Sequence, residues 1–186
     1  MTDHKEATYK SNYRECQISD DDKIWLARMC LGEGGKKCSR DKASAMLWAV
    51  MNRWHLWDRR KRYTDYVALA RAFSQPINPR WLPGGDLAKK WAGTRFASPA
   101  RFARRLWVCH RPWDKIPETI RVAVSDFQAG ELFPPDALHR LNRARITNWA
   151  SLKSTPEKFP WGLDIDGDWF FEDVGIRDGV VLVRFQ

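Results

Sequence analysis

The sequence predicts a mainly α-helical (α+β) domain with a small C-terminal β-hairpin. From residue 19 to about residue 145, apolar residues recur three or four positions apart in stretches bounded by Gly, Pro and Ser. Near the C-terminus the pattern becomes extended: residues 169–171 and 180–185 flank Asp178-Gly179, a dipeptide favoured in hairpin turns. The length of 186 residues and the 44% apolar content suit one domain, residues 19–186, preceded by a polar arm at residues 1–18.

The first two predicted helices surround a glycine-rich turn. Ser19 suits the N-cap of the first helix, and the three aspartates after it favour the positive end of the helix dipole. Gly32, Gly34 and Gly35 are expected to end this helix, which places Glu33 just past its last apolar turn. Ser39 is expected to cap a second helix that runs to about Trp54, because apolar residues recur there at helical spacing.

Four further helices are predicted. Thr64 starts the third, and Pro76 and Pro79 stop it. Residues 77–86 contain two prolines and two glycines, which favours an irregular surface loop of the kind that often lines sites. The remaining helices are expected at residues 98–109, with an inner face of Phe102, Leu106 and Cys109, at residues 117–130, and at residues 136–145.

The composition predicts an anionic partner without naming it. The formal charge of +9 attracts nucleic acid, anionic lipid and cell-wall polymers alike. Arginine clusters interleaved with tryptophan make a nucleic-acid-binding protein the main alternative function. No nucleic-acid reader motif accompanies these clusters, however, and several of the arginines are expected on outer helix faces, so binding of nucleic acid is not favoured. The clusters are Arg59–Arg62, Arg101, Arg104, Arg105, Arg111, Arg140, Arg143 and Arg145.

No metal, cofactor or membrane span is expected. The four histidines lack metal-ligand spacing, and the four cysteines form no CxxC pair and are expected to be buried thiols. The acidic run at residues 164–168 resembles the start of a calcium loop, but Trp169 and Gly175 occupy positions where that loop needs Gly and Glu, so a hydrogen-bonded turn is expected. The charged N-terminus lacks the apolar run of a secretory signal, which predicts synthesis in the cytoplasm.

A family resemblance rests on the first two helices. The segment from Ala27-Arg28 to Gly32-Glu33, followed by a helix that ends in Asn52-Arg53, resembles the SleB-type cell-wall hydrolases, which are similar to lytic transglycosylases and lysozymes. Residues 72–76 contain the family's Phe-Ser and Gln elements in altered order, and residues 135–137 and 167–171 extend the resemblance. This chain has Trp169 where the family usually carries His, and the family's Tyr-His pair is not recognisable.

The resemblance implies that residues 19–186 form a lysozyme-like catalytic domain and that Glu33 is the catalytic acid. Such enzymes cut peptidoglycan glycan strands between MurNAc and GlcNAc. The chemistry needs a carboxylic acid that stays protonated near neutral pH, and the apolar residues before Glu33 can supply the walls that raise its pKa. A lone Glu gives a 1,6-anhydro product, which is slightly favoured, whereas a second carboxylate gives hydrolysis. The sequence leaves this open, because four aspartates can approach Glu33: Asp41, Asp86, Asp136 and Asp168.

Several residues are expected to bind the substrate. Amides bind hydroxyl and acetamido groups, and aromatic rings stack on pyranose faces. For Asn52 the structural alternative is helix capping or hydrogen bonding to neighbouring loops, and for Gln75, Asn78 and Trp81 it is loop packing. The expected substrate-binding residues are Asn52, Ser74, Gln75, Asn78, Trp81, Asp168 and Phe171.

Peptidoglycan is the expected partner, and its location requires a delivery route. The chain is expected to reach the cell wall without a Sec signal, through holin release, virion injection or a dedicated secretion machine. A secreted effector would have a cognate immunity protein. A catalytically inactive protein that binds peptidoglycan is a further alternative, since fold does not fix function.

Overall fold

The computed structural model describes residues 18–55, 62–131, 148–151, 163–171, 176–177 and 180–181. The N-terminal arm before residue 18 and the helix expected at 136–145 lie outside these residues. The described part is mainly helical, with short antiparallel strands toward the C-terminus, so the predicted fold class is confirmed. The helices are α2 (Asp20–Gly34), α3 (Arg40–His55), α5 (Tyr66–Phe73), α6 (Asp86–Lys90), α7 (Pro99–Cys109) and α8 (Glu118–Ala129), with 3₁₀ turns η1 (Pro79–Trp81), η2 (Arg95–Ala97) and η3 (Trp113–Lys115).

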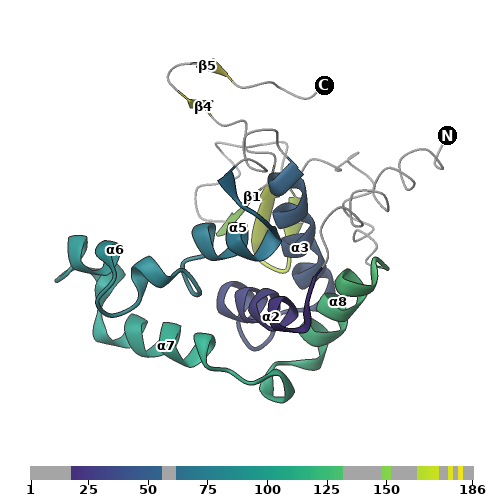
Figure 1. Ribbon diagram of the computed structural model, residues 1–186, viewed down its shortest axis with the longest axis horizontal. Helices are drawn as coiled ribbons and strands as arrows, with labels where there is room; N and C mark the ends of the chain where they lie inside the picture. The colour runs from purple at the N-terminus through teal and green to yellow at the C-terminus, as the bar shows by residue number, and fades with distance from the viewer. Residues whose placement is uncertain are drawn as a thin grey trace.

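Helix α2 is the central element of the fold. It contacts α3, α5, α7 and α8, and Figure 1 shows it surrounded by them. The residues from Leu26 to Gly32 are buried except Arg28, as expected for a helix that is covered on most sides. Its start follows the prediction, because Ser19 and Asp22 form a capping box. The helix continues to Gly34, so Glu33 lies within its last turn rather than just past its end.

Helices α3, α5 and α8 pack around α2 and begin close to where the sequence predicts. Ser39 accepts a hydrogen bond from the backbone N–H of Lys42 at the start of α3. Asp65, one residue after the expected Thr64, caps α5 by accepting from the N–H of Ala68. Helix α8 ends at Gly130 as predicted, and its buried residues are Ile120, Ala123, Val124 and Phe127.

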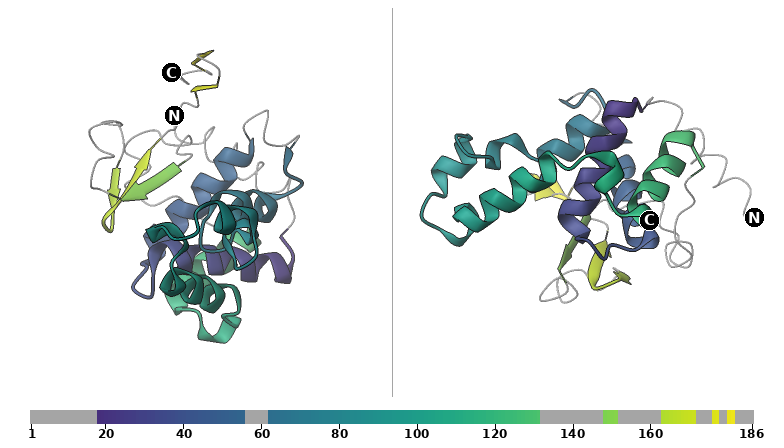
Figure 2. Two further views of the ribbon diagram at one scale, coloured as in Figure 1. Left: turned by 90° about the vertical axis from the view of Figure 1, so that its left-hand side faces the viewer. Right: turned by 90° about the horizontal axis from the view of Figure 1, so that it is seen from below.

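Helices α6 and α7 form a lobe that extends from the body of the molecule, together with η1 and η2 (Figures 1 and 2). Two predictions for this region are wrong. The loop at residues 77–86 contains the turn η1, because Asn78 caps it. In α7, Leu106 is 39% exposed and Arg105 is buried. Arg105 faces inward because its guanidinium donates hydrogen bonds to the carbonyls of Trp81 and Phe96 and so joins the parts of the lobe.

A three-stranded antiparallel sheet covers one side of the helical body, as the left view of Figure 2 shows. Its order is β1 (Asn148–Ser151), β3 (Asp168–Phe171), β2 (Leu163–Ile165), and β1 contacts α3. Asp166 and Gly167 connect β2 to β3 with positive φ angles of 50° and 79°, and the Asp164 carboxylate accepts from the N–H of Gly167. The acidic run is therefore a hydrogen-bonded turn, as predicted.

The expected C-terminal hairpin is present, with a different first strand. Strand β4 (Ile176–Arg177) pairs with β5 (Val180–Val181) in antiparallel orientation. Residues 169–171 were expected in this hairpin, but they belong to β3, the middle strand of the other sheet. The extended pattern predicted a strand correctly, but it could not identify β1 and β2 as its partners because pairing is a tertiary property.

Among the described residues, no helix combines the length and apolar character needed to cross a bilayer. Cys30, Cys38 and Cys109 are buried and free, as expected for thiols of the core. Burial raises the pKa of all three thiols, that of Cys38 to about 11. These cysteines are therefore poor nucleophiles.

Candidate active site

Glu33 lies at the C-terminal end of the central helix with a hydroxyl as its hydrogen-bond partner. The Ser74 hydroxyl donates to the Glu33 carboxylate over 2.7 Å. Ser74 is buried and ends helix α5, where its own backbone N–H donates to the carbonyl of Ala70. Two helix ends, far apart in sequence, thus bring the acid and the hydroxyl together.

The surroundings of Glu33 favour its neutral form. Burial raises the pKa of the carboxyl above its ordinary value, the Ser74 hydrogen bond opposes this, and the charge of Asp168 raises the pKa further. The Arg104 charge lowers it. The net result is a raised pKa, which is the direction of shift that a general acid requires.

Arg104 joins the lobe to the end of α2. Its guanidinium donates to the carbonyl of Gly32 over 3.1 Å. The backbone carbonyls in the last turn of a helix carry partial negative charge, which an arginine compensates. The sequence reasoning placed Arg104 on a solvated outer face. Arg104 is exposed, as expected for such a face, and its guanidinium also bonds the residue next to the candidate acid.

A second carboxylate, Asp168, stands at the start of β3. The Lys42 ammonium of α3 forms an ion pair with it over 2.8 Å and also donates to the carbonyl of Asp166 over 3.1 Å. The Ser39 hydroxyl bonds the Asp166 carboxylate. These contacts fasten the β2–β3 turn to the first turn of α3, which follows Glu33 after a short connection.

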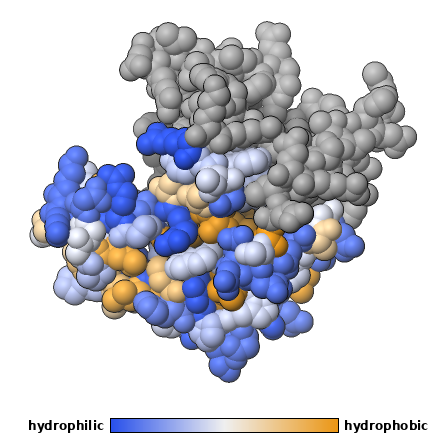
Figure 3. All heavy atoms as spheres, in the orientation of Figure 1, coloured by the Kyte–Doolittle hydropathy of each residue, from blue (hydrophilic) through white to orange (hydrophobic). Residues whose placement is uncertain are grey.

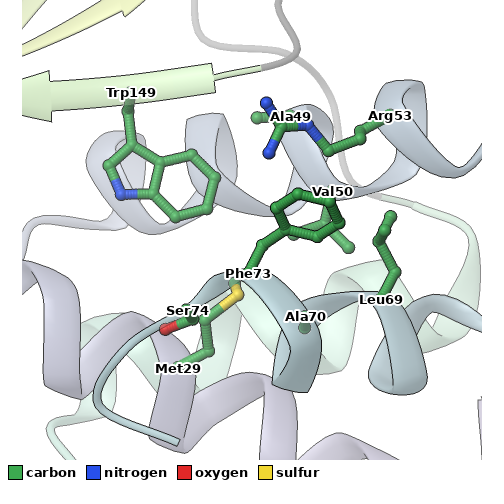
Figure 4. A pocket seen from close by; sticks show the side chains of 9 residues that line it. All are labelled: Met29, Ala49, Val50, Arg53, Leu69, Ala70, Phe73, Ser74 and Trp149. Atoms are coloured by element: carbon green, nitrogen blue, oxygen red, sulfur yellow. The ribbon is translucent and has the colours of Figure 1, made fainter. Parts of the chain in front are cut away.

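A small pocket of about 10 Å³, roughly the room of one water molecule, lies beside Ser74, the residue whose hydroxyl bonds Glu33. Ser74 lines it on the side of α5, and Trp149 of β1 lines it on the side of the sheet (Figure 4). The Arg53 guanidinium lies 4.6 Å from the centre of the Phe73 ring at the same pocket. The remaining lining residues are Met29, Ala49, Val50, Leu69 and Ala70. Apart from Ser74 and Arg53, the lining of this pocket is apolar.

The predicted sugar-binding residues of the loop after α5 have different environments. Gln75 is exposed and directly follows Ser74. Asn78 is buried, and its amide donates to the carbonyl of Ala72 and accepts from the N–H of Arg80. Trp81 is also buried, under the Arg105 guanidinium 5.0 Å from its ring centre. Asn78 and Trp81 therefore serve loop packing, which was the structural alternative for them. Neither residue is retained as a sugar contact.

Two other predicted residues lie on elements of the site. Asn52 is half-buried in the last turn of α3, beside the pocket residue Arg53. Phe171 ends β3 opposite Asn148, and its side chain is outside the described part of the structure. Lys42 and Trp149 were missed as site residues. No local pattern identifies them, because they reach the site only through contacts between distant segments.

Within the described ranges, no three His, Cys, Asp or Glu side chains are grouped so that they could hold a metal ion. Comparisons with protein-family models, curated proteins and solved structures find no match for this chain. The resemblance to cell-wall hydrolases therefore stays a prediction.

Proposed function

We propose that this protein cuts the glycan strands of peptidoglycan between MurNAc and GlcNAc, with Glu33 as the general acid. The observation that carries the proposal is the environment of Glu33, a carboxyl whose pKa is raised by burial and which accepts a hydrogen bond from Ser74, a residue that lines the small pocket. Breaking a glycosidic bond requires a proton for the leaving oxygen as positive charge develops on the sugar. A raised pKa keeps the Glu33 carboxyl protonated to higher pH than an ordinary glutamate, which favours it as the donor of that proton.

The lobe supports an anionic carbohydrate as the substrate. Residues 80–111 carry eight arginines and lysines and a single acid, Asp86, which is already paired with Arg80 over 2.6 Å. Figure 3 shows hydrophilic residues over this lobe, at the left, with apolar ones between them. Trp91 is 40% exposed and contacts Phe96 edge to face, so its ring can stack on a sugar. Peptidoglycan combines pyranose rings with peptide carboxylates, which match these two features.

The sharpest test identifies which bond is cut. Purified sacculi are incubated with the protein, and the soluble products are analysed by mass spectrometry. Disaccharide units that still carry their peptide stems support glycan cleavage. Products cut within the peptides, or no soluble products at all, would overturn the proposal.

Nucleic acid is the other anionic polymer that the basic lobe could bind, and the same preparation tests it. In a gel-shift experiment with duplex DNA at increasing salt, we expect only weak, salt-sensitive binding. Tight binding to DNA together with no release from sacculi would favour the alternative. A protein that binds sacculi but releases nothing would be an inactive binding protein.

A further inference from the structure

We propose that Asp168 is the second catalytic carboxylate, the general base that activates water, so that the enzyme is a hydrolase with reducing-end products. This inference rests on the proposed function of the Glu33 site and names the outcome of its reaction. The sequence reasoning slightly favoured a 1,6-anhydro product, which needs only one acid. The placement of Asp168 favours the other outcome.

The sheet directs Asp168 toward the site. Alternate residues of a strand point to the same face, so Asp168 shares a face with Phe170, which is fully buried in the core. Trp149 is paired with Phe170 across the sheet, and their rings stack at 6.3 Å. Trp149 in turn lines the pocket that also holds Ser74, the hydrogen-bond partner of Glu33. The sheet face that carries Asp168 is therefore the face toward the pocket.

The two carboxylates have different surroundings. Glu33 receives a hydrogen bond from a neutral hydroxyl, whereas Asp168 is ion-paired with Lys42. The side chains of this ion pair are only 19% and 10% exposed, so the lysine charge acts through little water. The two carboxyl groups therefore differ in their partners, a neutral hydroxyl for Glu33 and a lysine ammonium for Asp168. Lys42 is then a positioning residue, since it also holds the carbonyl of Asp166.

The reaction balances with water as the only co-reactant. The Glu33 carboxyl gives its proton to the glycosidic oxygen as the bond between that oxygen and the anomeric carbon breaks. A water oxygen forms the new bond to the anomeric carbon, and the Asp168 carboxylate takes the proton that this water loses. Glu33 ends ionised and Asp168 protonated, and exchange with solvent restores both.

The first experiment needs no variant. Sacculi are digested by the wild-type protein in heavy-oxygen water, and the new glycan ends are analysed by mass spectrometry. Incorporation of one heavy oxygen at the MurNAc reducing end supports the inference. Anhydro ends without heavy oxygen would overturn it, while leaving glycan cleavage by Glu33 in place.

The second experiment compares Asp168→Asn with Asp126→Asn. Asp126 is a matched control, because it is also ion-paired, to Arg40 over 2.6 Å, and is 23% exposed. Loss of a general base lowers the rate by roughly 100- to 10,000-fold, and we expect such a loss only for Asp168→Asn. Thermal unfolding and sedimentation with sacculi verify that the variant folds and binds. A folded Asp168→Asn protein with the wild-type rate, measured beside an inactive Glu33→Gln protein, would overturn the inference.

The role of Lys42 is tested by its conservative variant. Lys42→Met removes the charge beside Asp168, and we expect a lower rate and a changed pH profile of glycan cleavage. Lys42→Arg restores the charge and should recover most of the rate. A purely structural role for Lys42 predicts an unchanged pH profile for any Lys42→Met protein that folds.

Discussion

Replacing Gly32 by alanine has two opposing effects on stability at the end of the central helix, a gain in helix propensity and a steric clash. Alanine is better than glycine inside a helix by about 0.5–1 kcal/mol, so propensity alone predicts a more stable protein. A Cβ at this position, however, would lie 2.3 Å from the Cβ and 2.8 Å from the Cγ of Pro76. Both separations are far below van der Waals contact, and overpacking of this kind costs roughly 1–3 kcal/mol.

The contact with Pro76 is expected to win. We predict that Gly32→Ala lowers the free energy of unfolding by about 1–2 kcal/mol, which for a domain of this size lowers Tm by roughly 2–8 °C. Glycan cleavage should fall as well, because Pro76 follows Ser74 closely and its displacement moves the hydroxyl away from Glu33. Thermal unfolding followed by circular dichroism measures the first effect, and release of soluble muropeptides measures the second.

A double-mutant cycle with Pro76→Gly isolates the contact. Removing the proline ring relieves the clash, so the two substitutions together should cost less than the sum of their separate costs, by about 1–3 kcal/mol. A stabilised Gly32→Ala protein, or a cycle with no coupling, would refute the reasoning.

Three further predictions concern charge and protonation. Ser74→Ala removes a hydrogen bond that favours the ionised form of Glu33, so the alkaline limb of the pH–activity profile should move to higher pH. The free energy of unfolding at pH 7 should fall by about 1–3 kcal/mol. A shift of the alkaline limb to lower pH would contradict this prediction. Since the pKa of Glu33 is raised above 4.5 in the folded protein, wild type loses stability as pH rises through the native pKa. Urea unfolding should show that Glu33→Gln gains stability relative to wild type above the native pKa of Glu33, but gains little at pH 4. A difference in stability between the two proteins that does not change with pH would contradict this prediction. The double substitution Lys89→Glu and Lys90→Glu should weaken binding to sacculi, measured by sedimentation at low salt, roughly two- to thirtyfold, at about 0.2–1 kcal/mol per exposed charge. Lys115→Glu on η3, outside the lobe, should not weaken it. Equal effects of the two changes would exclude the lobe as the binding surface.

The sequence predicts the helices well because their signals are local. Three of the helices begin with a serine whose side chain accepts a hydrogen bond from a backbone N–H in the first turn: Ser19, Ser39 and Ser98. Gly130 ends α8 in the left-handed conformation. The error in α7 has a tertiary cause. Apolar periodicity favoured Leu106 as an inner residue, but the buried hydrogen bonds of Arg105 set the rotation of the helix.

The site was predictable only in part. Glu33 was predicted from its glycine neighbours and its distance to Asn52, and Ser74 was predicted from the family resemblance of residues 72–76. The ion pair between Lys42 and Asp168 spans more than a hundred residues of sequence, so no local pattern reveals it. Asn78 and Trp81 have suitable chemistry for sugars, but the loop's own hydrogen bonding and packing use them.

The release of soluble muropeptides by wild type and by Glu33→Gln tests the central claim most directly. Glutamine keeps the shape of the side chain and removes only the proton that a general acid must give. We predict that wild type releases disaccharide–peptide units and that the folded Glu33→Gln protein still binds sacculi but releases at least about 100-fold less. Equal release by the two proteins would contradict the assignment of Glu33 as the catalytic acid.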